Sequence, residues 1–294
     1  MKLVEEPKTL SFLRRRESMP NTSGLATKLD SRLRRNDDLK SISALGTLNG
    51  TPTVWQLPEE VPVAILLNSL PYAVMMATPA DLEDFALGFV LSEGLVVHHT
   101  HVNNVIVLIQ DEGLSVDVAI AKDKLLRDRM ISRSLEGRVG CGLCGISELE
   151  DTIRMPKHKV KPVPFSTAAI HSAFTALPQH QPMHADNHTV HGAAFCSVDG
   201  SIRLAREDVG RHNALDKLIG AMARSETAPE NGFVVMSSRC SFELVQKCAM
   251  VGIGALATIS APTALALKLA RQAGVRLAAY AKQGVMMFDG DTNG

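Results

Sequence analysis

The residues best suited to covalent chemistry are two cysteines set among glycines, in the run Gly140-Cys141-Gly142-Leu143-Cys144-Gly145. A thiolate is a strong nucleophile, and a nearby cation such as Arg138 lowers the pKa of a cysteine. The glycines leave the backbone free and the two sulfur atoms poorly shielded. The sequence therefore predicts covalent sulfur chemistry in this segment.

A C-x-x-C pair has two other common uses, as half of a structural zinc site and as a dithiol redox pair. Zinc needs about four protein ligands, and the remaining cysteines, Cys196, Cys240 and Cys248, do not have zinc-ribbon spacing. Histidines elsewhere in the chain leave a mixed zinc site open. The motif alone is compatible with zinc binding, redox chemistry and sulfur transfer.

The bulk composition limits the class of protein. The chain has 294 residues, of which 45% are hydrophobic and 21% charged, with a formal net charge of zero. These values are typical of a soluble globular protein with one large or two ordinary domains, and they give no drive toward nucleic acid or an anionic membrane. Five cysteines and no visible signal peptide favour a reducing cytoplasm.

Three segments follow from the patterning. Residues 1–45 are polar and slightly basic, which is typical of a flexible tail. Residues 46–157 read as an α+β domain that ends in the C-x-x-C loop, after which a stretch rich in Lys and Pro forms a linker. Residues 158–294 alternate strands and helices, which predicts an α/β domain with a largely parallel sheet covered on both faces.

Helices and strands are predicted on both sides of the C-x-x-C loop. In the first domain we expect strands at 61–67 and 72–77, a helix to Ser92 with Thr78 as N-cap and Pro79 at N1, and a hairpin of 102–110 with 114–121. In the second we expect helices at 166–177, 209–223, 242–252 and 262–272, and strands at 193–197, 202–205, 233–237, 255–260 and 275–281. Ligands of such sheets bind beyond the carboxyl ends of the strands.

Several polar residues are expected at those strand ends. One group lies between an expected strand and the helix after it. Asp208 supplies a carboxylate, Arg211 a guanidinium that binds anions with two hydrogen bonds, and His212 an imidazole, a group that titrates near neutral pH. Capping of the helix explains the same run equally well. His191 precedes a strand beside small residues, which allows a ligand to approach closely.

Two turns rich in hydroxyl side chains each lie between an expected strand and the helix that follows it. They contain Ser238 with Arg239 and Ser260 with Thr263, and Lys282 follows the last expected strand. Helix N-termini at such turns favour anions, so a nucleotide diphosphate is the predicted ligand, although simple capping explains each turn alone. The series from His180 to His191 has metal-like spacing, but its Pro and Asn content indicates a loop, and we expect no metal.

Taken together, these motifs resemble the FdhD family, accessory sulfur carriers of formate dehydrogenase. The resemblance covers about residues 54–288. Its residues are Glu59–Val63, Met75–Pro79, Asp84–Phe89, Ser92–Gly94, Cys141–Gly145, Glu207–Lys217, Ser238–Arg239, Phe242–Lys247 and Ser260–Thr263. The family pattern has a Thr-Gly-Gly-like turn before the histidine that matches His191, whereas this chain has His188-Thr189-Val190 there.

The resemblance implies a function and a site. Cys141 and Cys144 would carry a persulfide received from a cysteine desulfurase and deliver its sulfur to the molybdenum cofactor, bis-molybdopterin guanine dinucleotide, for formate dehydrogenase. It also implies a homodimer and a cytidine-deaminase-like three-layer αβα domain at 158–294. That domain would bind the cofactor through His191, Asp208, Arg211, His212, Ser238, Arg239, Ser260, Thr263 and Lys282. A nucleotide-binding regulatory protein with a structural or redox C-x-x-C is the alternative.

Overall fold

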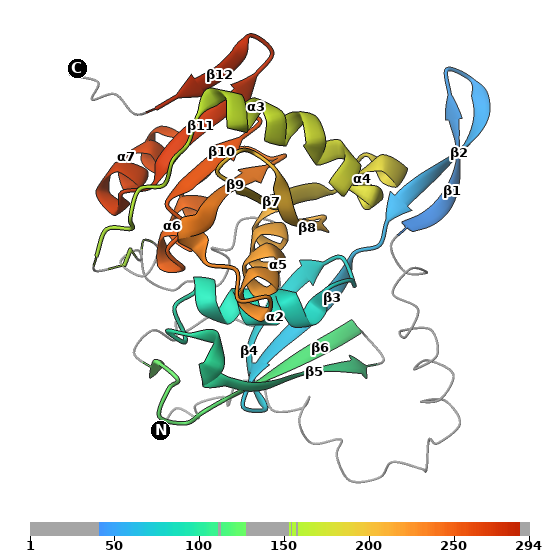
Figure 1. The fold of residues 1–294 in the computed structure, drawn as a ribbon. Coiled ribbons are helices and arrows are strands. Elements are labelled where there is room, and N and C mark those ends of the chain that lie inside the picture. Colours follow the sequence, from blue (N-terminus) through green and yellow to red (C-terminus); the bar gives the residue numbers. More distant parts are fainter. Residues whose placement is uncertain (1–40, 111–112, 128–152, 154, 157, 289–294) are drawn as a thin grey trace, which may run out of the picture. The chain divides into compact units, whose positions relative to one another are not determined.

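The computed structural model describes residues 41–110, 113–127, 153, 155–156 and 158–288, which belong to one compact unit spanning Leu39–Gly294. The strands of these residues form three sheets (Figure 1). A two-stranded ribbon contains β1 (Ser41–Leu48) and β2 (Thr51–Pro58). The other two sheets have four and six strands.

The four-stranded sheet has the order β4-β3-β6-β5. Its strands are β3 (Val61–Leu67), β4 (Leu70–Ala77), β5 (Val102–Gln110) and β6 (Gly113–Ile120). Pairing is antiparallel except between β3 and β6, which run parallel. Alternate residues of β3 are buried, as in a sheet with one covered face. The predicted strands and hairpin of this region are confirmed.

The helix that follows β4 starts later than the sequence predicts. α2 spans Leu82–Ser92, and its N-cap is Asp81 in the left-handed region, with φ 51°. Thr78 does not cap it: its backbone N–H donates to Asp208 at 3.0 Å, and its Oγ1 accepts from the backbone N–H of Val209 at 3.1 Å. The assignment of Thr78 as N-cap was wrong because tertiary partners recruit the groups that a cap would use.

The six-stranded sheet has the order β12-β11-β10-β9-β7-β8. Its strands are β7 (His191–Ser197), β8 (Ile202–Asp208), β9 (Gly232–Met236), β10 (Ala255–Thr258), β11 (Arg276–Ala281) and β12 (Gly284–Met287). Within this sheet the parallel pairs of neighbouring strands are β9 with β10 and β10 with β11. The sheet is therefore mixed rather than largely parallel, because hairpins add antiparallel strands at both sides.

Helices cover both faces of this sheet, and buried hydrophobic residues lie on each side of it. The helices are α3 (Thr167–Ala176), α4 (Pro182–Asn187), α5 (Arg211–Arg224), α6 (Phe242–Met250) and α7 (Ala264–Ala273), with short 3₁₀ turns at His99–His101, Leu177–His180 and Pro229–Asn231. Ala193 and Phe195 of β7 join the core on the side of α5 and α6, while Ala194 and Cys196 join the core on the side of α3. Successive side chains of β7 thus point to opposite faces of the sheet and contribute to the hydrophobic core on each side.

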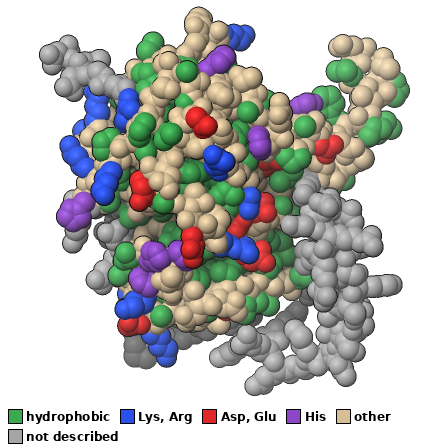
Figure 2. Space-filling view, in the orientation of Figure 1, with side chains coloured by type: hydrophobic (Ala, Val, Ile, Leu, Met, Phe, Trp, Pro, Cys, Tyr) green, Lys and Arg blue, Asp and Glu red, His purple; other side chains and the backbone are tan. Residues whose placement is uncertain are grey.

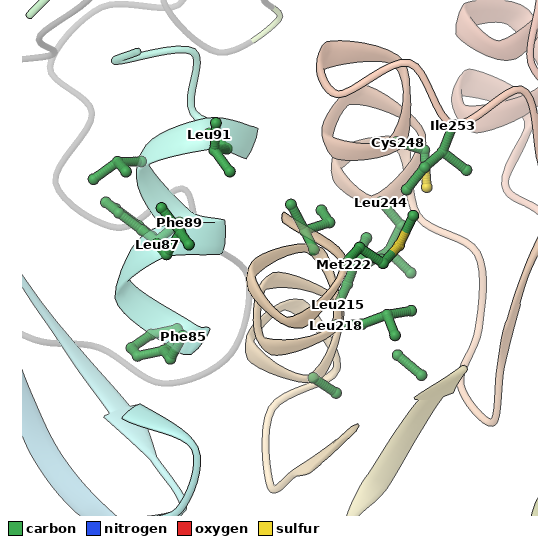
Figure 3. Close-up of a cluster of buried hydrophobic side chains, with 14 of the residues drawn as sticks. Phe85, Leu87, Phe89, Leu91, Leu215, Leu218, Met222, Leu244, Cys248 and Ile253 are labelled. Carbon is green, nitrogen blue, oxygen red and sulfur yellow. The ribbon is translucent and has the colours of Figure 1, made fainter. Parts of the chain in front are cut away.

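The two larger sheets share one hydrophobic core. Figure 3 shows α2 and α5 side by side, with Phe85 and Phe89 on α2 and Leu215 and Leu218 on α5. The same cluster extends to Leu244 of α6 and to both sheets. The division into domains at residues 157 and 158 stays a prediction.

The sequence patterns did not predict the ribbon of β1 and β2. The expected tail ended at residue 45, but Ser41 already pairs with Pro58. The ribbon is held to α4, where Asn187 Nδ2 donates to Ser41 Oγ at 3.3 Å. Among the described residues, none of the helices has the length and apolar character needed to cross a bilayer.

Candidate functional site

Cys141 and Cys144, the predicted sulfur-carrying residues, lie outside the described residues. The other three cysteines are described and buried. Burial, with a smaller contribution from a nearby carboxylate, raises the pKa of Cys196 and of Cys240 to about 12. Burial also raises the pKa of Cys248. These three thiols are therefore protonated at neutral pH and unsuited to nucleophilic attack.

A pocket of about 690 Å³ opens at the edge of the six-stranded sheet. Ser237, Ile259 and Lys282 line it, and they directly follow β9, β10 and β11. Because these three strands are parallel, their carboxyl ends meet at one edge. β7 runs the other way, so its first residue, His191, joins them in the pocket lining. The predicted location of a ligand at the strand ends thus coincides with a pocket.

His191 is half-buried in this lining. The backbone N–H of Gly192 donates to Ser237 Oγ at 2.8 Å, which ties the start of β7 to the end of β9. Burial, followed by the positive charge of Arg211, lowers the pKa of His191 below its ordinary value of 6.5. The imidazole is therefore mostly neutral at pH 7 and can donate one hydrogen bond and accept another.

Asp208 is fully buried in a polar network next to the pocket region. It forms an ion pair with Lys217 Nζ at 2.6 Å and accepts hydrogen bonds from the backbone N–H of Thr78 and Gly210 and from Asn213 Nδ2. Its carboxylate has donors on both oxygen atoms. This geometry favours a positioning role for Asp208, which fixes the turn before Arg211, over direct contact with a ligand.

A group of buried polar atoms without hydrogen-bond partners lies at the N-termini of α5 and α6. Among the described residues, Arg211 Nε, His212 Nε2, Ser241 Oγ and Glu243 Oε2 belong to it. His212 is 3% exposed, and its Nε2 lies 3.9 Å from Glu243 Oε2. Unpartnered buried polar atoms are costly and call for a ligand or water. Because the set combines the Arg211 guanidinium with the Glu243 carboxyl group, it fits a polar ligand that both donates and accepts hydrogen bonds.

The charge state of Glu243 follows from its neighbours. Burial by itself would raise the pKa of Glu243, but the His212 and Ser241 side chains outweigh burial and hold this pKa below its ordinary value. Glu243 is therefore a carboxylate at neutral pH.

The remaining residues predicted to bind the ligand do not line this pocket. Ser238 is buried and its Oγ donates to its neighbour's carbonyl oxygen, while Arg239 and Ser260 are exposed. Thr263 is the N-cap of α7, and its Oγ1 accepts from the backbone N–H of Ala266 at 3.2 Å. Capping therefore accounts for Thr263. Of the nine predicted binding residues, only His191 and Lys282 line the pocket.

Sequence reasoning missed several residues that line the pocket. They are Phe174, Gln181, His184, His188 and Tyr280. Part of the segment expected to be a loop forms α4, which brings His184 and His188 to the pocket. Gln181 is 4% exposed and its Nε2 has no hydrogen-bond partner among the described residues. His184 and His188 are four residues apart, and this spacing was the signal in the sequence that both lie on the same face of a helix.

Comparisons with known proteins agree with this picture. Residues 58–288 match the model of the FdhD/NarQ family. The chain is 46% identical over 229 residues to a sulfur carrier protein FdhD of Cupriavidus necator, covering 78% of this chain and 80% of that protein. It is 44% identical over 255 residues to the one of Chromobacterium violaceum, covering 85% and 94%.

A solved structure shares the fold. It comes from Desulfotalea psychrophila and is described as a formate dehydrogenase accessory protein. The TM-score is 0.64 at 23% identity, with 86% of this chain and 98% of that chain covered.

Proposed function

The chain belongs to the FdhD/NarQ family, and from that premise we propose that it is a sulfur carrier and sulfurtransferase. It takes sulfur from a cysteine desulfurase as a persulfide. It then delivers the sulfur to the molybdenum cofactor, bis-molybdopterin guanine dinucleotide, which formate dehydrogenase requires. The relatives named as sulfur carrier proteins support the first part of this proposal.

The state of the cysteines carries the proposal. Sulfur transfer needs a thiolate, and the three described cysteines are buried thiols with raised pKa values. The nucleophile must then come from Cys141 or Cys144, the pair flanked by glycines. The chemistry is a thiolate attack on the outer sulfur of the desulfurase persulfide. The donor S–S bond breaks, a new S–S bond forms on this chain, and the donor cysteine leaves as a thiolate.

The pocket is the proposed site for the guanine dinucleotide part of the cofactor. Lys282 supplies a positive charge and His191 a hydrogen-bond donor at the strand ends. The unpartnered atoms of Arg211 and His212 add further capacity for polar ligand atoms. Ser238, Arg239 and Ser260 remain proposed contacts, while Asp208 positions the turn and Thr263 caps α7. A cytidine-deaminase-like topology, a homodimer and a cytoplasmic location are proposed from the family resemblance.

Complementation tests the function in cells. A bacterial strain that lacks its own carrier of this family receives the full chain, and formate-dependent dye reduction is measured in extracts. The wild type should restore activity, while Cys141→Ala and Cys144→Ala should each reduce it at least about tenfold, because both thiols are needed for the relay. Cys196→Ala is the matched control and should restore activity. Full restoration by both C-x-x-C variants would contradict the proposal.

A further inference from the structure

The ribbon of β1 and β2 lies almost entirely outside the residues that match the family model, yet it contacts the pocket-bearing part of the chain. Trp55, the only tryptophan of the sequence, is 45% exposed on β2. Figure 2 shows hydrophobic side chains exposed along this ribbon and a histidine side chain near its base. The ribbon therefore offers aromatic and apolar surface beside a pocket that the family core provides.

An aromatic contact links the ribbon to the pocket. The ring centroids of Trp55 and His188 are 6.1 Å apart, with an interplanar angle of 57°. His188 lines the pocket and lies at the end of α4, in the left-handed region. His184 meets His188 edge to face at 5.8 Å and also lines the pocket. Three aromatic rings thus run from the pocket wall to the ribbon.

The rings of Trp55 and His188 are both exposed to solvent. At the other aromatic part of the lining, Phe174 and Tyr280 are stacked on each other at 4.7 Å and 17°, so each covers a face of the other. Trp55 and His188 are tilted instead, and both are exposed. An exposed, tilted pair leaves room for a planar ring to stack on the indole.

We propose that Trp55 and His188 form a stacking platform for the purine base of a nucleoside diphosphate whose phosphates reach His191 and Lys282. The inference rests on the proposed function, in which this pocket receives a guanine dinucleotide. It adds a recognition element for the base, and this element comes from a ribbon outside the family match.

Guanosine diphosphate and inorganic pyrophosphate are suitable probes, since only the first has a base. Binding of each to the full chain is measured by calorimetry, with Trp55 emission as a second signal from a single fluorophore. Trp55→Ala should weaken guanosine diphosphate binding about 5- to 150-fold and leave pyrophosphate binding unchanged. Trp55→Phe should restore most of the affinity.

Leu45→Ala is the matched control, because Leu45 is 79% exposed on the same ribbon and pairs with Val54, not with Trp55. It should bind both probes like the wild type. If Trp55→Ala binds guanosine diphosphate as tightly as the wild type, or loses both probes equally, the stacking platform is refuted and the nucleotide pocket stands. If the wild type binds neither probe, the nucleotide part of the proposed function fails as well.

Discussion

A buried network of charged side chains links α2, α5 and α6. Lys247 Nζ of α6 lies 3.0 Å from each carboxylate oxygen of Asp216 on α5 and 3.1 Å from Glu93 Oε1, just past the end of α2. Ser92 Oγ completes the group, donating to Asp216 at 2.6 Å. Such a network offsets the desolvation of its charges only while every member has its partner.

Removing the cation should therefore be costly. Lys247→Met leaves the Asp216 carboxylate buried without its cation, and it should lower the free energy of unfolding by about 3–5 kcal/mol in urea denaturation. Lys268→Met, at an exposed position of α7, should change it by less than about 0.5 kcal/mol. The double variant Asp216→Asn, Lys247→Met should cost less than the sum of the single changes. Strict additivity would show that the two groups do not interact.

The titration of His191 follows from its surroundings. Burial and Arg211 lower its pKa in the folded chain, so the unfolded chain binds the proton more tightly. The stability of the fold is thus unaffected by this group well above about pH 6.5 and is reduced as the pH falls below that value. In an NMR titration, the imidazole signal that disappears in His191→Gln should have a midpoint below 6.5. A midpoint at or above that value would contradict the described environment.

At the scale of elements, two glycines set how closely α2 and α5 approach. A Cβ on Gly88 of α2 would overlap the carbonyl oxygen of Asp216, and a Cβ on Gly220 of α5 would overlap that of Asp84. The obstacles are backbone atoms, which cannot rotate away. The crossing of these helices therefore requires glycine at both positions.

Alanine at this crossing should push the helices apart. Gly88→Ala should destabilise the chain by about 3 kcal/mol or more, the upper end of overpacking effects, because backbone must move. Gly46→Ala in β1 is the matched control, since its nearest neighbour is an oxygen 4.0 Å away, and its effect should be within about 1 kcal/mol. Equal midpoints of urea unfolding for the two variants would refute the tight crossing.

The elements that the sequence predicted correctly are those whose signals are local. Ser166 accepts from the backbone N–H of Ala169 as the N-cap of α3, and Gly274 ends α7 with φ 80°. The errors occur where distant partners decide. Thr78 bonds to the turn after β8 instead of capping α2, and β7 joins the sheet antiparallel to β9. The spacing of hydrophobic residues along the chain indicates neither the partners of Thr78 nor the direction of β7.

The site was predicted to a similar extent. The reasoning from strand ends placed Lys282 at the edge where β9, β10 and β11 end, because parallel strands bring their carboxyl ends together. His191 reaches the same edge because β7 is antiparallel to β9, an orientation that the sequence did not predict. The use of Thr263 as a cap and the burial of Asp208 depend on the packed structure. The contribution of α4 and the ribbon depends on contacts between segments far apart in sequence.

At the scale of the whole molecule, one buried cluster includes residues of the four-stranded sheet, α2, α5, α6 and the six-stranded sheet. A shared core couples the unfolding of its parts. Differential scanning calorimetry of the full chain should therefore show one transition whose van't Hoff and calorimetric enthalpies agree. Two separate transitions would instead support independent domains divided at residues 157 and 158.

Intact-protein mass spectrometry shows directly whether Cys141 and Cys144 carry sulfur. The triple variant Cys196→Ala, Cys240→Ala, Cys248→Ala keeps only Cys141 and Cys144. After incubation with a cysteine desulfurase and cysteine, it should gain about 32 Da per sulfur atom, and reductant should remove that mass. Further substitution of Cys141 and Cys144 by alanine should abolish the gain. A chain that gains no sulfur, or that gains it equally without these two cysteines, is not a sulfur carrier that works through the C-x-x-C pair.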